Sequence, residues 1–300
     1  MKMRILGIQS GTAGYNQPDK EYADQQIRFC EEQIEKEKPE LVMFPEMMTG
    51  HYFGMVTDKR WFAGAEDFYH GPTTTKMLEL SKKHHVHVCY SLFEKDGEDY
   101  YNTMGLISPT RGVIARYRKI HIPGGDKRYD NICEKFYFKS GAETPVVELD
   151  NGIRVAMMLC YDRSFPELWR TYYFKHADII CVAACTMGIR FPMFVTELQT
   201  RALESHSYVM ALNRAGTEQV EGEAQPRQHF GRSLIADPMG NLLDTREDEP
   251  WSSVCAEIDT DKIAYARARL NWERDRHPEV YEGLMKEPVI DKEHTLGIGY

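Results

Sequence analysis

Apolar runs of strand length alternate along the chain with amphipathic segments of helix length. The runs MRILGIQ (residues 3–9) and ELVMFPE (residues 40–46) have the continuous apolar character of buried parallel strands. Between them, residues 22–36 have the length and periodicity of a crossover helix, which parallel strands need because a tight turn cannot join them. The pattern therefore predicts a β-α-β unit at the start of the chain.

The same alternation continues through the rest of the chain. Helices are predicted over residues 74–84, from Phe165 onward and over residues 194–206, and strands over VHVCYSLFEK, RVAMMLC, ADIICVAAC, YVMALNRAG, GRSLIADP and SSVCAEID. The stretch YNTMGLISPTRGVIARYRKI predicts a hairpin with SPTRG as its turn, so some strands pair antiparallel. We therefore expect an α/β fold with mixed sheets covered by helices.

Domain organisation is predicted from what lies between these elements. No Pro-, Gly- or Ser-rich linker divides the 300 residues, so we expect one domain over residues 1–300. A charged, helix-like tail begins near Asp261.

Three strand-like runs end in, or lead directly into, a reactive side chain. These are Glu46 after LVMFP, Lys119 after VIARYR and Cys160 after VAMML. In open α/β sheets the active site lies beyond the carboxyl ends of the strands, where several strands present side chains to one crevice. The three residues are therefore candidates to meet in one site.

The segment after Cys160 resembles a helix start. Ser164 and Glu167 have the spacing of a capping box, and Pro166 fits the first turn. The positive end of such a helix, together with Lys119, would favour a thiolate, and Glu46 could exchange a proton with the thiol during acyl transfer. The alternative is a buried, inert thiol that ends a strand. Local features alone leave both interpretations open.

Composition limits the class of partner. The net charge is −9, and no basic stripe of the kind that binds nucleic acid is present. No apolar run approaches the roughly 20 residues that span a bilayer, and the apolar part of the N-terminus is too short for a signal peptide. We therefore expect a cytoplasmic protein that binds a small molecule, and neither nucleic acid nor a membrane.

The seven cysteines do not predict a disulfide framework or a metal site. Their number is odd and no CxxC pair occurs, so reduced thiols are expected. Cys181 and Cys185 lie in an apolar strand pattern without His or Asp ligands nearby.

Four ordered motifs resemble the nitrilase, or carbon-nitrogen hydrolase, superfamily. Its Glu-Lys-Cys triad is matched by FPEMMTG at Glu46, RYRKIHIPG at Lys119 and MLCYDRSFPE at Cys160, and EKFYFKSG matches a further active-site glutamate at Glu134. The resemblance spans essentially the whole chain. It implies that Glu46 is the general base, that Lys119 and the Tyr161 backbone N–H stabilise the oxyanion, and that Cys160 forms a thioester.

The resemblance also carries expectations about architecture and assembly. It implies a four-layer α-β-β-α sandwich, assembled as a homodimer or homotetramer in which the tail from about residue 261 contributes contacts. Glu134 would orient Lys119 or the substrate. Neither a metal nor an organic cofactor is implied.

Within the superfamily the chain is most similar to the N-carbamoyl amino acid amidohydrolases. Arg163 matches an arginine that holds the substrate carboxylate in the D-specific enzymes, although an ion pair with an acid of this chain is the alternative. Tyr161 and Ser164 depart from the D-specific pattern. His121, Tyr161 and Asn102 are further candidate substrate contacts, with loop support as the alternative for His121 and Asn102.

The sequence therefore predicts hydrolysis of an N-carbamoyl amino acid to the amino acid, ammonia and carbon dioxide. The alternatives are an ω-amidase, or an amidohydrolase of the N-carbamoylputrescine or β-ureidopropionate type. A non-catalytic binding or scaffold protein is the alternative from another class.

Overall fold

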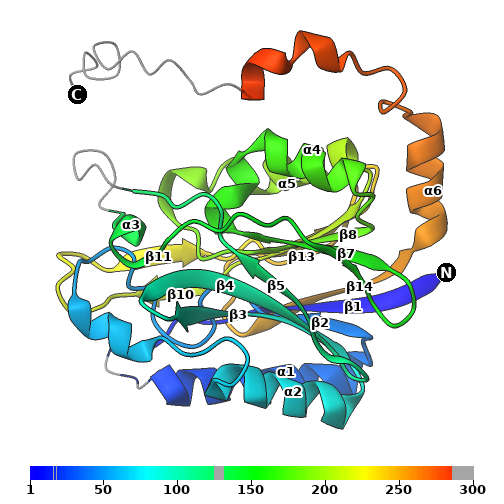
Figure 1. Ribbon diagram of the computed structural model, residues 1–300. Coiled ribbons are helices and arrows are strands. Elements are labelled where there is room, and N and C mark those ends of the chain that lie inside the picture. The colour runs from blue at the N-terminus through cyan, green and yellow to red at the C-terminus, as the bar shows by residue number, and fades with distance from the viewer. Residues whose placement is uncertain (16, 18, 125–131, 286–300) are drawn as a thin grey trace.

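Two six-stranded sheets stacked face to face form the centre of the computed structural model, which describes residues 1–15, 17, 19–124 and 132–285. Helices cover the outer face of each sheet (Figure 1). The predicted α-β-β-α sandwich with mixed sheets is confirmed.

The first sheet has the strand order β14-β1-β2-β3-β4-β5. The strands β1, β2 and β3 run parallel, and the flanking pairs are antiparallel. Helices α1 and α2 make the two crossovers and lie below this sheet in Figure 1. The bounds are β1 Lys2–Gln9, α1 Asp19–Glu37, β2 Leu41–Met43, α2 Pro72–His84, β3 His87–Asp96, β4 Asp99–Ser108, β5 Gly112–Arg118 and β14 Ser252–Asp259.

The second sheet has the strand order β13-β12-β9-β8-β7-β6. Here β7, β8 and β9 run parallel, and the flanking pairs are again antiparallel. Helices α4 and α5 make the crossovers and lie above the sheet in Figure 1. The bounds are β6 Val146–Glu148, β7 Arg154–Leu159, α4 Pro166–Phe174, β8 Ile179–Ala183, α5 Phe194–Ser205, β9 Tyr208–Leu212, β12 Leu234–Ala236 and β13 Leu242–Thr245.

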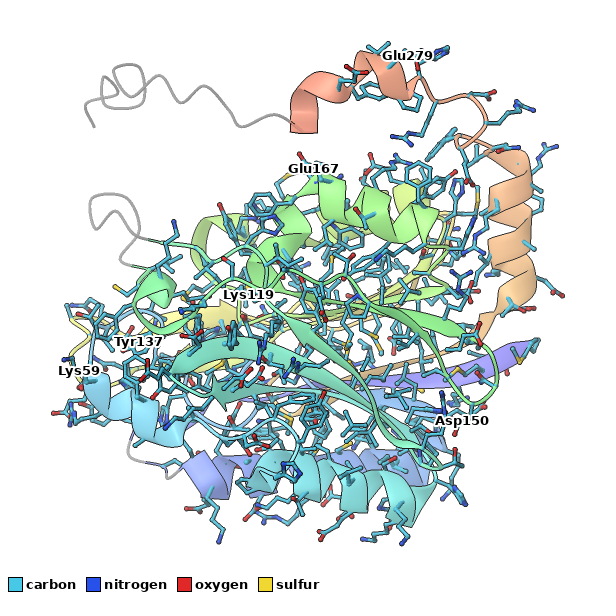
Figure 2. All side chains as sticks on the ribbon, viewed as in Figure 1. Lys59, Lys119, Tyr137, Asp150, Glu167 and Glu279 are labelled. Carbon is cyan, nitrogen blue, oxygen red and sulfur yellow. The ribbon has the colours of Figure 1, made fainter. Side chains whose placement is uncertain are left out.

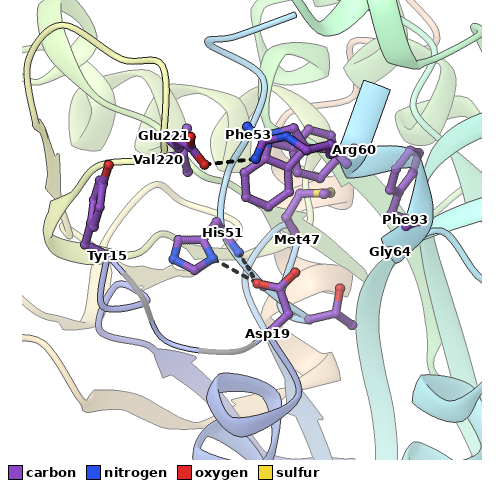
Figure 3. Close-up of a pocket in the computed structure, with 14 residues that line it drawn as sticks. Tyr15, Asp19, Met47, His51, Phe53, Arg60, Gly64, Phe93, Val220 and Glu221 are labelled. Carbon is purple, nitrogen blue, oxygen red and sulfur yellow. Dashed lines mark hydrogen bonds and ion pairs between the residues drawn. The ribbon is translucent and has the colours of Figure 1, made fainter. Parts of the chain in front are cut away.

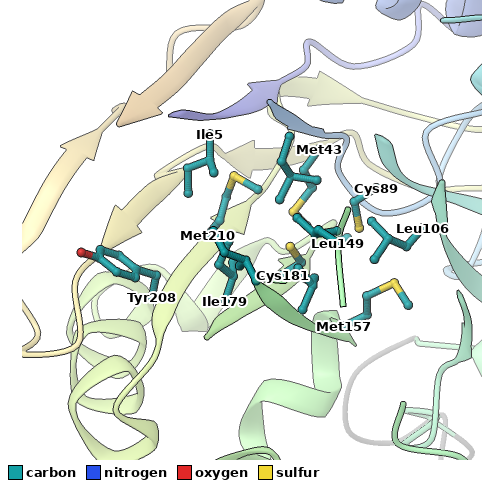
Figure 4. Close-up of a cluster of buried hydrophobic side chains, with 14 of the residues drawn as sticks. Ile5, Met43, Cys89, Leu106, Leu149, Met157, Ile179, Cys181, Tyr208 and Met210 are labelled. Carbon is teal, nitrogen blue, oxygen red and sulfur yellow. The ribbon is translucent and has the colours of Figure 1, made fainter. Parts of the chain in front are cut away.

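Apolar side chains fill the space between the two sheets. Alternate residues of the strands point inward, and those that Figure 4 labels are Ile5, Met43, Cys89, Leu106, Met157, Ile179, Cys181, Tyr208 and Met210. Leu149, which directly follows β6, belongs to the same cluster. The opposite faces of the same strands pack against the helices in two further clusters. Both faces of each sheet are thus buried, which explains the continuous apolar runs in the sequence.

Smaller elements complete the described chain. The helix α3 (Glu134–Tyr137) and the two-stranded sheet of β10 (Ala215–Glu218) and β11 (Arg227–Phe230) lie at one end of the sandwich, and α6 (Thr260–Arg269) follows β14. Three short 3-10 turns are Lys59–Gly64, Cys160–Ser164 and Gly188–Arg190, and two more, Pro278–Val280 and Glu282–Met285, lie near the C-terminus. None of the described helices is long and apolar enough to cross a membrane. The predicted single domain, and the predicted oligomer with its tail contacts, stay predictions, and residues 286–300 of that tail lie outside the described residues.

Candidate active site

The candidate residues come from strand ends on both sheets. Lys119 directly follows β5, and Glu46 follows β2 by three residues, so both belong to the first sheet. Cys160 directly follows β7 of the second sheet. Lys119 lies inside the body of the protein, whereas Glu167 lies at its upper surface (Figure 2). The face-to-face stacking of the sheets thus brings side chains from distant strands to the same end of the sandwich.

The Lys119 ammonium is the centre of a buried polar cluster. Its Nζ donates to Glu46 Oε1 at 2.9 Å and to Glu134 Oε2 at 2.7 Å. All three side chains are at most 1% exposed. A charge buried this deeply must be paired, because desolvation otherwise costs several kcal/mol or more. The cluster therefore holds one fixed cation between two carboxylates.

The pKa directions show that this cation is retained. Burial alone would lower the pKa of Lys119, but the Glu134 and Glu46 carboxylates outweigh burial and hold the pKa well above its ordinary value. Burial raises the pKa of Glu134, and this effect exceeds the opposing effect of the Lys119 ammonium. Lys119 is therefore a permanent hydrogen-bond donor in this site.

Cys160 sits in a strained backbone conformation next to polar groups. Its φ of 46° lies in the left-handed region, which a residue other than glycine adopts only at a cost. Its Sγ lies 3.4 Å from Thr186 Oγ1 and 3.6 Å from Arg163 Nη1. Burial raises the Cys160 pKa and Glu46 raises it further, while Lys119 and Arg163 lower it only in part. The raised pKa favours a neutral thiol over a thiolate in the resting site, so the thiol needs a base.

The predicted capping box after Cys160 is also wrong. Residues 160–164 form a separate 3-10 turn, and α4 begins at Pro166 with Phe165 as its N-cap. No side chain caps this helix, and the Ser164 hydroxyl has no hydrogen-bond partner among the described residues. Pro166 does occupy the first turn, as predicted, because its missing N–H needs no partner there.

Comparison with known proteins decides the family. The family model for "Carbon-nitrogen hydrolase" matches residues 8–268. The chain belongs to the carbon-nitrogen hydrolase family. This is a family of the nitrilase superfamily, so the predicted superfamily is confirmed.

Individual relatives agree with this family. The chain is 27% identical over 263 residues to the N-carbamoylputrescine amidase of Arabidopsis thaliana, which covers 82% of this chain and 84% of the relative. It is 31% identical over 249 residues to the 2-oxoglutaramate amidase of Bacillus subtilis, covering 81% and 88%. The crystal structure of a carbon-nitrogen hydrolase from Helicobacter pylori G27 has the same fold, with a TM-score of 0.87, 24% identity and coverage of 95% and 99%.

Asn102 of this carbon-nitrogen hydrolase contacts the base candidate. The Asn102 side chain is fully buried, and its Nδ2 donates to Glu46 Oε1 at 2.8 Å. Glu46 Oε1 thus accepts from both Asn102 and Lys119, which fixes the orientation of the carboxylate. This contact favours the supporting role for Asn102 over the predicted contact with substrate.

Arg163 has a carboxylate partner within the chain. It is 2% exposed, its Nε lies 3.5 Å from Glu197 Oε2, and its Nη1 donates to the Cys160 carbonyl at 2.7 Å. The guanidinium also lies over the Phe194 ring at 5.1 Å. Glu197 also pairs with Arg190 at 2.5 Å, and the buried Arg163 Nε has no hydrogen-bond partner among the described residues. The ion pair therefore compensates the charge of Arg163 only in part, and binding of a substrate carboxylate stays a prediction.

His121 and Tyr161 lie around Phe165. The His121 ring stacks on Phe165 at 3.5 Å, and its Nδ1 lies 2.7 Å from Asp162 Oδ1. Tyr161 meets the same ring edge-on at 5.2 Å and is 39% exposed. His121 therefore has the contacts of a loop support, and Tyr161 keeps an exposed ring that a ligand could reach.

Two organising residues were missed by the sequence analysis. Tyr52 donates from its hydroxyl to Glu134 Oε1 at 2.6 Å, and the buried Asp162 accepts from the Tyr117 hydroxyl at 2.6 Å and from the His121 N–H at 2.8 Å. Asp162 stands two residues after Cys160, but nothing in its local sequence marks it as the partner of Tyr117 and His121. Tyr52 had no motif to mark it, since its partner Glu134 is 82 residues away.

A cavity of about 620 Å³ opens beside the segment that follows Glu46 (Figure 3). Stacked rings of Phe53 and Trp61, 5.2 Å apart, line it together with an His51–Asp19 contact of 2.9 Å. Its described lining includes neither Lys119, Glu134 nor Cys160. Enclosed volume alone therefore does not locate the reactive groups, which are found from charge and hydrogen bonding.

Proposed function

We propose that this protein hydrolyses a linear C–N bond through a thioester on Cys160. One observation carries the proposal: a buried Lys119 ammonium, 2.9 Å from Glu46 and 2.7 Å from Glu134, acts electrostatically on a thiol held on a strained turn and lowers its pKa. This is the geometry of a nucleophile with a base and a fixed cation.

Each proposed role follows from the chemistry of the group. Cys160 Sγ attacks the carbonyl carbon and Glu46 accepts the thiol proton, which the raised Cys160 pKa makes necessary. Lys119 stabilises the tetrahedral oxyanion together with the Tyr161 backbone N–H. Glu46 returns the proton to the leaving nitrogen, and the C–N bond breaks to leave a thioester. Glu46 then activates water, which hydrolyses the thioester and restores the thiol.

The proposed substrate class is the N-carbamoyl compounds, with an N-carbamoyl amino acid as the first candidate. Hydrolysis of its ureido group gives the amino acid, ammonia and carbon dioxide. The similarity to N-carbamoylputrescine amidases supports a ureido substrate. Glu197 lies 3.5 Å from Arg163 but pairs with Arg190 at 2.5 Å, so Arg163 keeps a donor for a substrate carboxylate. N-carbamoylputrescine and β-ureidopropionate are competing ureido substrates. The 2-oxoglutaramate amidase among the relatives favours an ω-amide as the second candidate class.

Ammonia release across a substrate panel tests the class. The panel comprises N-carbamoyl-D- and L-amino acids, N-carbamoyl-β-alanine, N-carbamoylputrescine and ω-amides. We expect turnover of ureido compounds. Rapid hydrolysis of ω-amides without any ureido turnover would remove the carbamoyl assignment and leave the thioester chemistry intact.

The Cys160→Ala variant tests the chemistry itself. We expect no measurable turnover of the best substrate and an unchanged melting temperature, since the change removes only the sulfur. Cys255→Ala is the matched control, because Cys255 is also partly exposed but lies on β14. Wild-type rates in Cys160→Ala would exclude the proposed nucleophile. Absence of turnover in the wild type on the whole panel would favour the scaffold alternative.

A further inference from the structure

A second buried ion pair lies behind the segment that carries Glu46. Arg214 Nη1 contacts Glu218 Oε1 at 2.9 Å, and both side chains are fully buried. Arg214 follows β9 and Glu218 ends β10, so both belong to the second half of the chain. The Arg214 guanidinium therefore extends from the second half of the chain toward the first half.

Arg214 holds the backbone immediately after Glu46. Its Nη2 donates to the carbonyl oxygens of Glu46 at 3.2 Å and Gly50 at 2.7 Å, and also to that of Met47. Met47 has a φ of 53°, so the chain turns sharply directly after the base candidate. Because a guanidinium has several donors in a rigid fork, one side chain can hold such a turn from inside.

Glu218 holds the backbone of Tyr52 at the same time. The Tyr52 N–H donates to Glu218 Oε2 at 3.2 Å, and the Tyr52 carbonyl accepts from Arg227 Nη2 at 2.9 Å. The hydroxyl of the same Tyr52 donates to Glu134 Oε1 at 2.6 Å. Glu218 is thus connected to Glu134 through one tyrosine.

These contacts form a closed circuit. Starting at Arg214, it runs through Glu218, Tyr52 and Glu134 to Lys119, and from Lys119 to Glu46, whose carbonyl returns to Arg214. The Lys119 ammonium is the point where the two carboxylates meet. Any movement of the Arg214–Glu218 pair would therefore reach both carboxylates.

We propose that the Arg214–Glu218 pair positions Glu46 and Glu134 around Lys119. The two residues are positioning residues and act through the Glu46 turn and Tyr52. Correct geometry at the reacting atoms is worth a large rate factor, and a displacement of about 1 Å can cost about 10²-fold. The inference rests on the proposed function, because the positions matter only if Glu46, Lys119 and Glu134 act on substrate.

Two conservative variants test the pair. Glu218→Gln keeps the shape but cannot accept from both Arg214 and Tyr52, and Arg214→Lys keeps the charge but cannot reach Glu218 and three carbonyls at once. We expect kcat to fall by about 10- to 100-fold, with KM changed by less than about twofold. Circular dichroism and a cooperative melting curve establish that each variant is folded. If Glu218→Gln does not fold, the kcat and KM of Arg214→Lys test the proposal.

A matched control separates positioning from a general loss of stability. Asp178 is a mostly buried carboxylate that pairs with Arg267 at 3.2 Å and precedes β8, at the opposite strand ends from the site. Asp178→Asn should lower the melting temperature and leave kcat within about twofold.

A double-variant cycle tests the connection through Tyr52. If Glu218 acts through Tyr52, the Glu218→Gln/Tyr52→Phe protein should lose hardly more kcat than the worse single variant. The Asp178→Asn/Tyr52→Phe losses should multiply. The proposal is overturned if folded Glu218→Gln and Arg214→Lys have wild-type kcat. Its connection through Tyr52 is overturned if the Glu218→Gln and Tyr52→Phe losses multiply. Activity of Cys160→Ala, measured beside them, reports separately on the proposed chemistry.

Discussion

The two sheets of the sandwich have the same strand topology but different chemistry. In each, three parallel strands occupy the centre, with one antiparallel strand on one side and two on the other. In each, two helices cross over between the parallel strands and cover the outer face. By their order in the sheets, β1 is equivalent to β7, β2 to β8 and β3 to β9.

Equivalent strand ends carry different side chains. The segment after β2 supplies Glu46, whereas the segment after β8 supplies Thr186, whose hydroxyl lies 3.4 Å from the thiol. The first sheet contributes the paired charges, and the second contributes the strained turn of Cys160. The repeated architecture thus fixes where reactive groups can meet, and the side chains at those positions decide the role of each half.

Removing the cation of the first sheet should have the largest effect. Lys119→Met leaves Glu46 and Glu134 buried without their shared partner, so we expect about a 10³-fold loss of kcat or more. The free energy of unfolding should fall by about 3–5 kcal/mol at neutral pH, as for other broken buried pairs. It should recover partly as pH is lowered, because burial raises the pKa of Glu134, which then binds a proton that the unfolded chain does not.

Lys139→Met is the control for this substitution. Lys139 pairs with Asp99 at 2.5 Å but is 64% exposed. Its replacement should therefore change neither kcat nor the free energy of unfolding appreciably. Chemical denaturation at several pH values, together with steady-state kinetics, gives both readings. Near-normal activity of Lys119→Met would show that the charged half is dispensable.

Loosening the base without removing a charge should have an intermediate effect. Asn102→Leu deletes the 2.8 Å hydrogen bond to Glu46 Oε1. A hydrogen bond to a charged group contributes about 1.5–3 kcal/mol, so kcat should fall by about 10- to 100-fold. KM should stay nearly constant if Asn102 supports Glu46, and should rise if Asn102 touches substrate. Asn241→Leu is the control, because it removes a 3.2 Å contact with Asp237 far from the site. Its kcat and KM should both be near normal.

The smallest effect concerns the ionisation of the thiol in the second sheet. Because burial and Glu46 raise the pKa of Cys160, its alkylation by iodoacetamide should still rise with pH well above about 8.5, where alkylation of an ordinary thiol levels off. Lys119→Met should raise this pKa further, since Lys119 lowers it. Mass spectrometry of labelled peptides gives the rate, with fully buried Cys30 as the unreactive control. A plateau below about pH 8 would instead indicate a resting thiolate.

Most of the fold was accessible from periodicity alone. The long strands and the helices α1, α2, α4 and α5 were predicted because both faces of each sheet are buried and the helices are amphipathic. The missed strands β6, β13, β10 and β11 have three or four residues, and each includes polar or partly exposed positions. The equally short β2 and β12 were predicted because they are wholly apolar and buried.

The site was only partly accessible. Glu46, Lys119, Glu134 and Cys160 could be named from motifs, but the contacts of Tyr52 could not, since they depend on how distant segments pack. The capping-box prediction was wrong because residues 160–164 form a separate 3-10 turn before the helix starts. The choice between thiol and thiolate stayed open because helix position is visible in sequence, whereas depth of burial is not.

The left-handed backbone at Cys160 has a consequence for the durability of the fold. At a φ of 46°, glycine would relieve strain that any larger side chain imposes. The protein is therefore less stable with cysteine at this position than it would be with glycine. The cysteine is nevertheless needed there for its sulfur. A search for more heat-resistant versions guided by stability alone would favour glycine there and abolish the reaction that the turn serves.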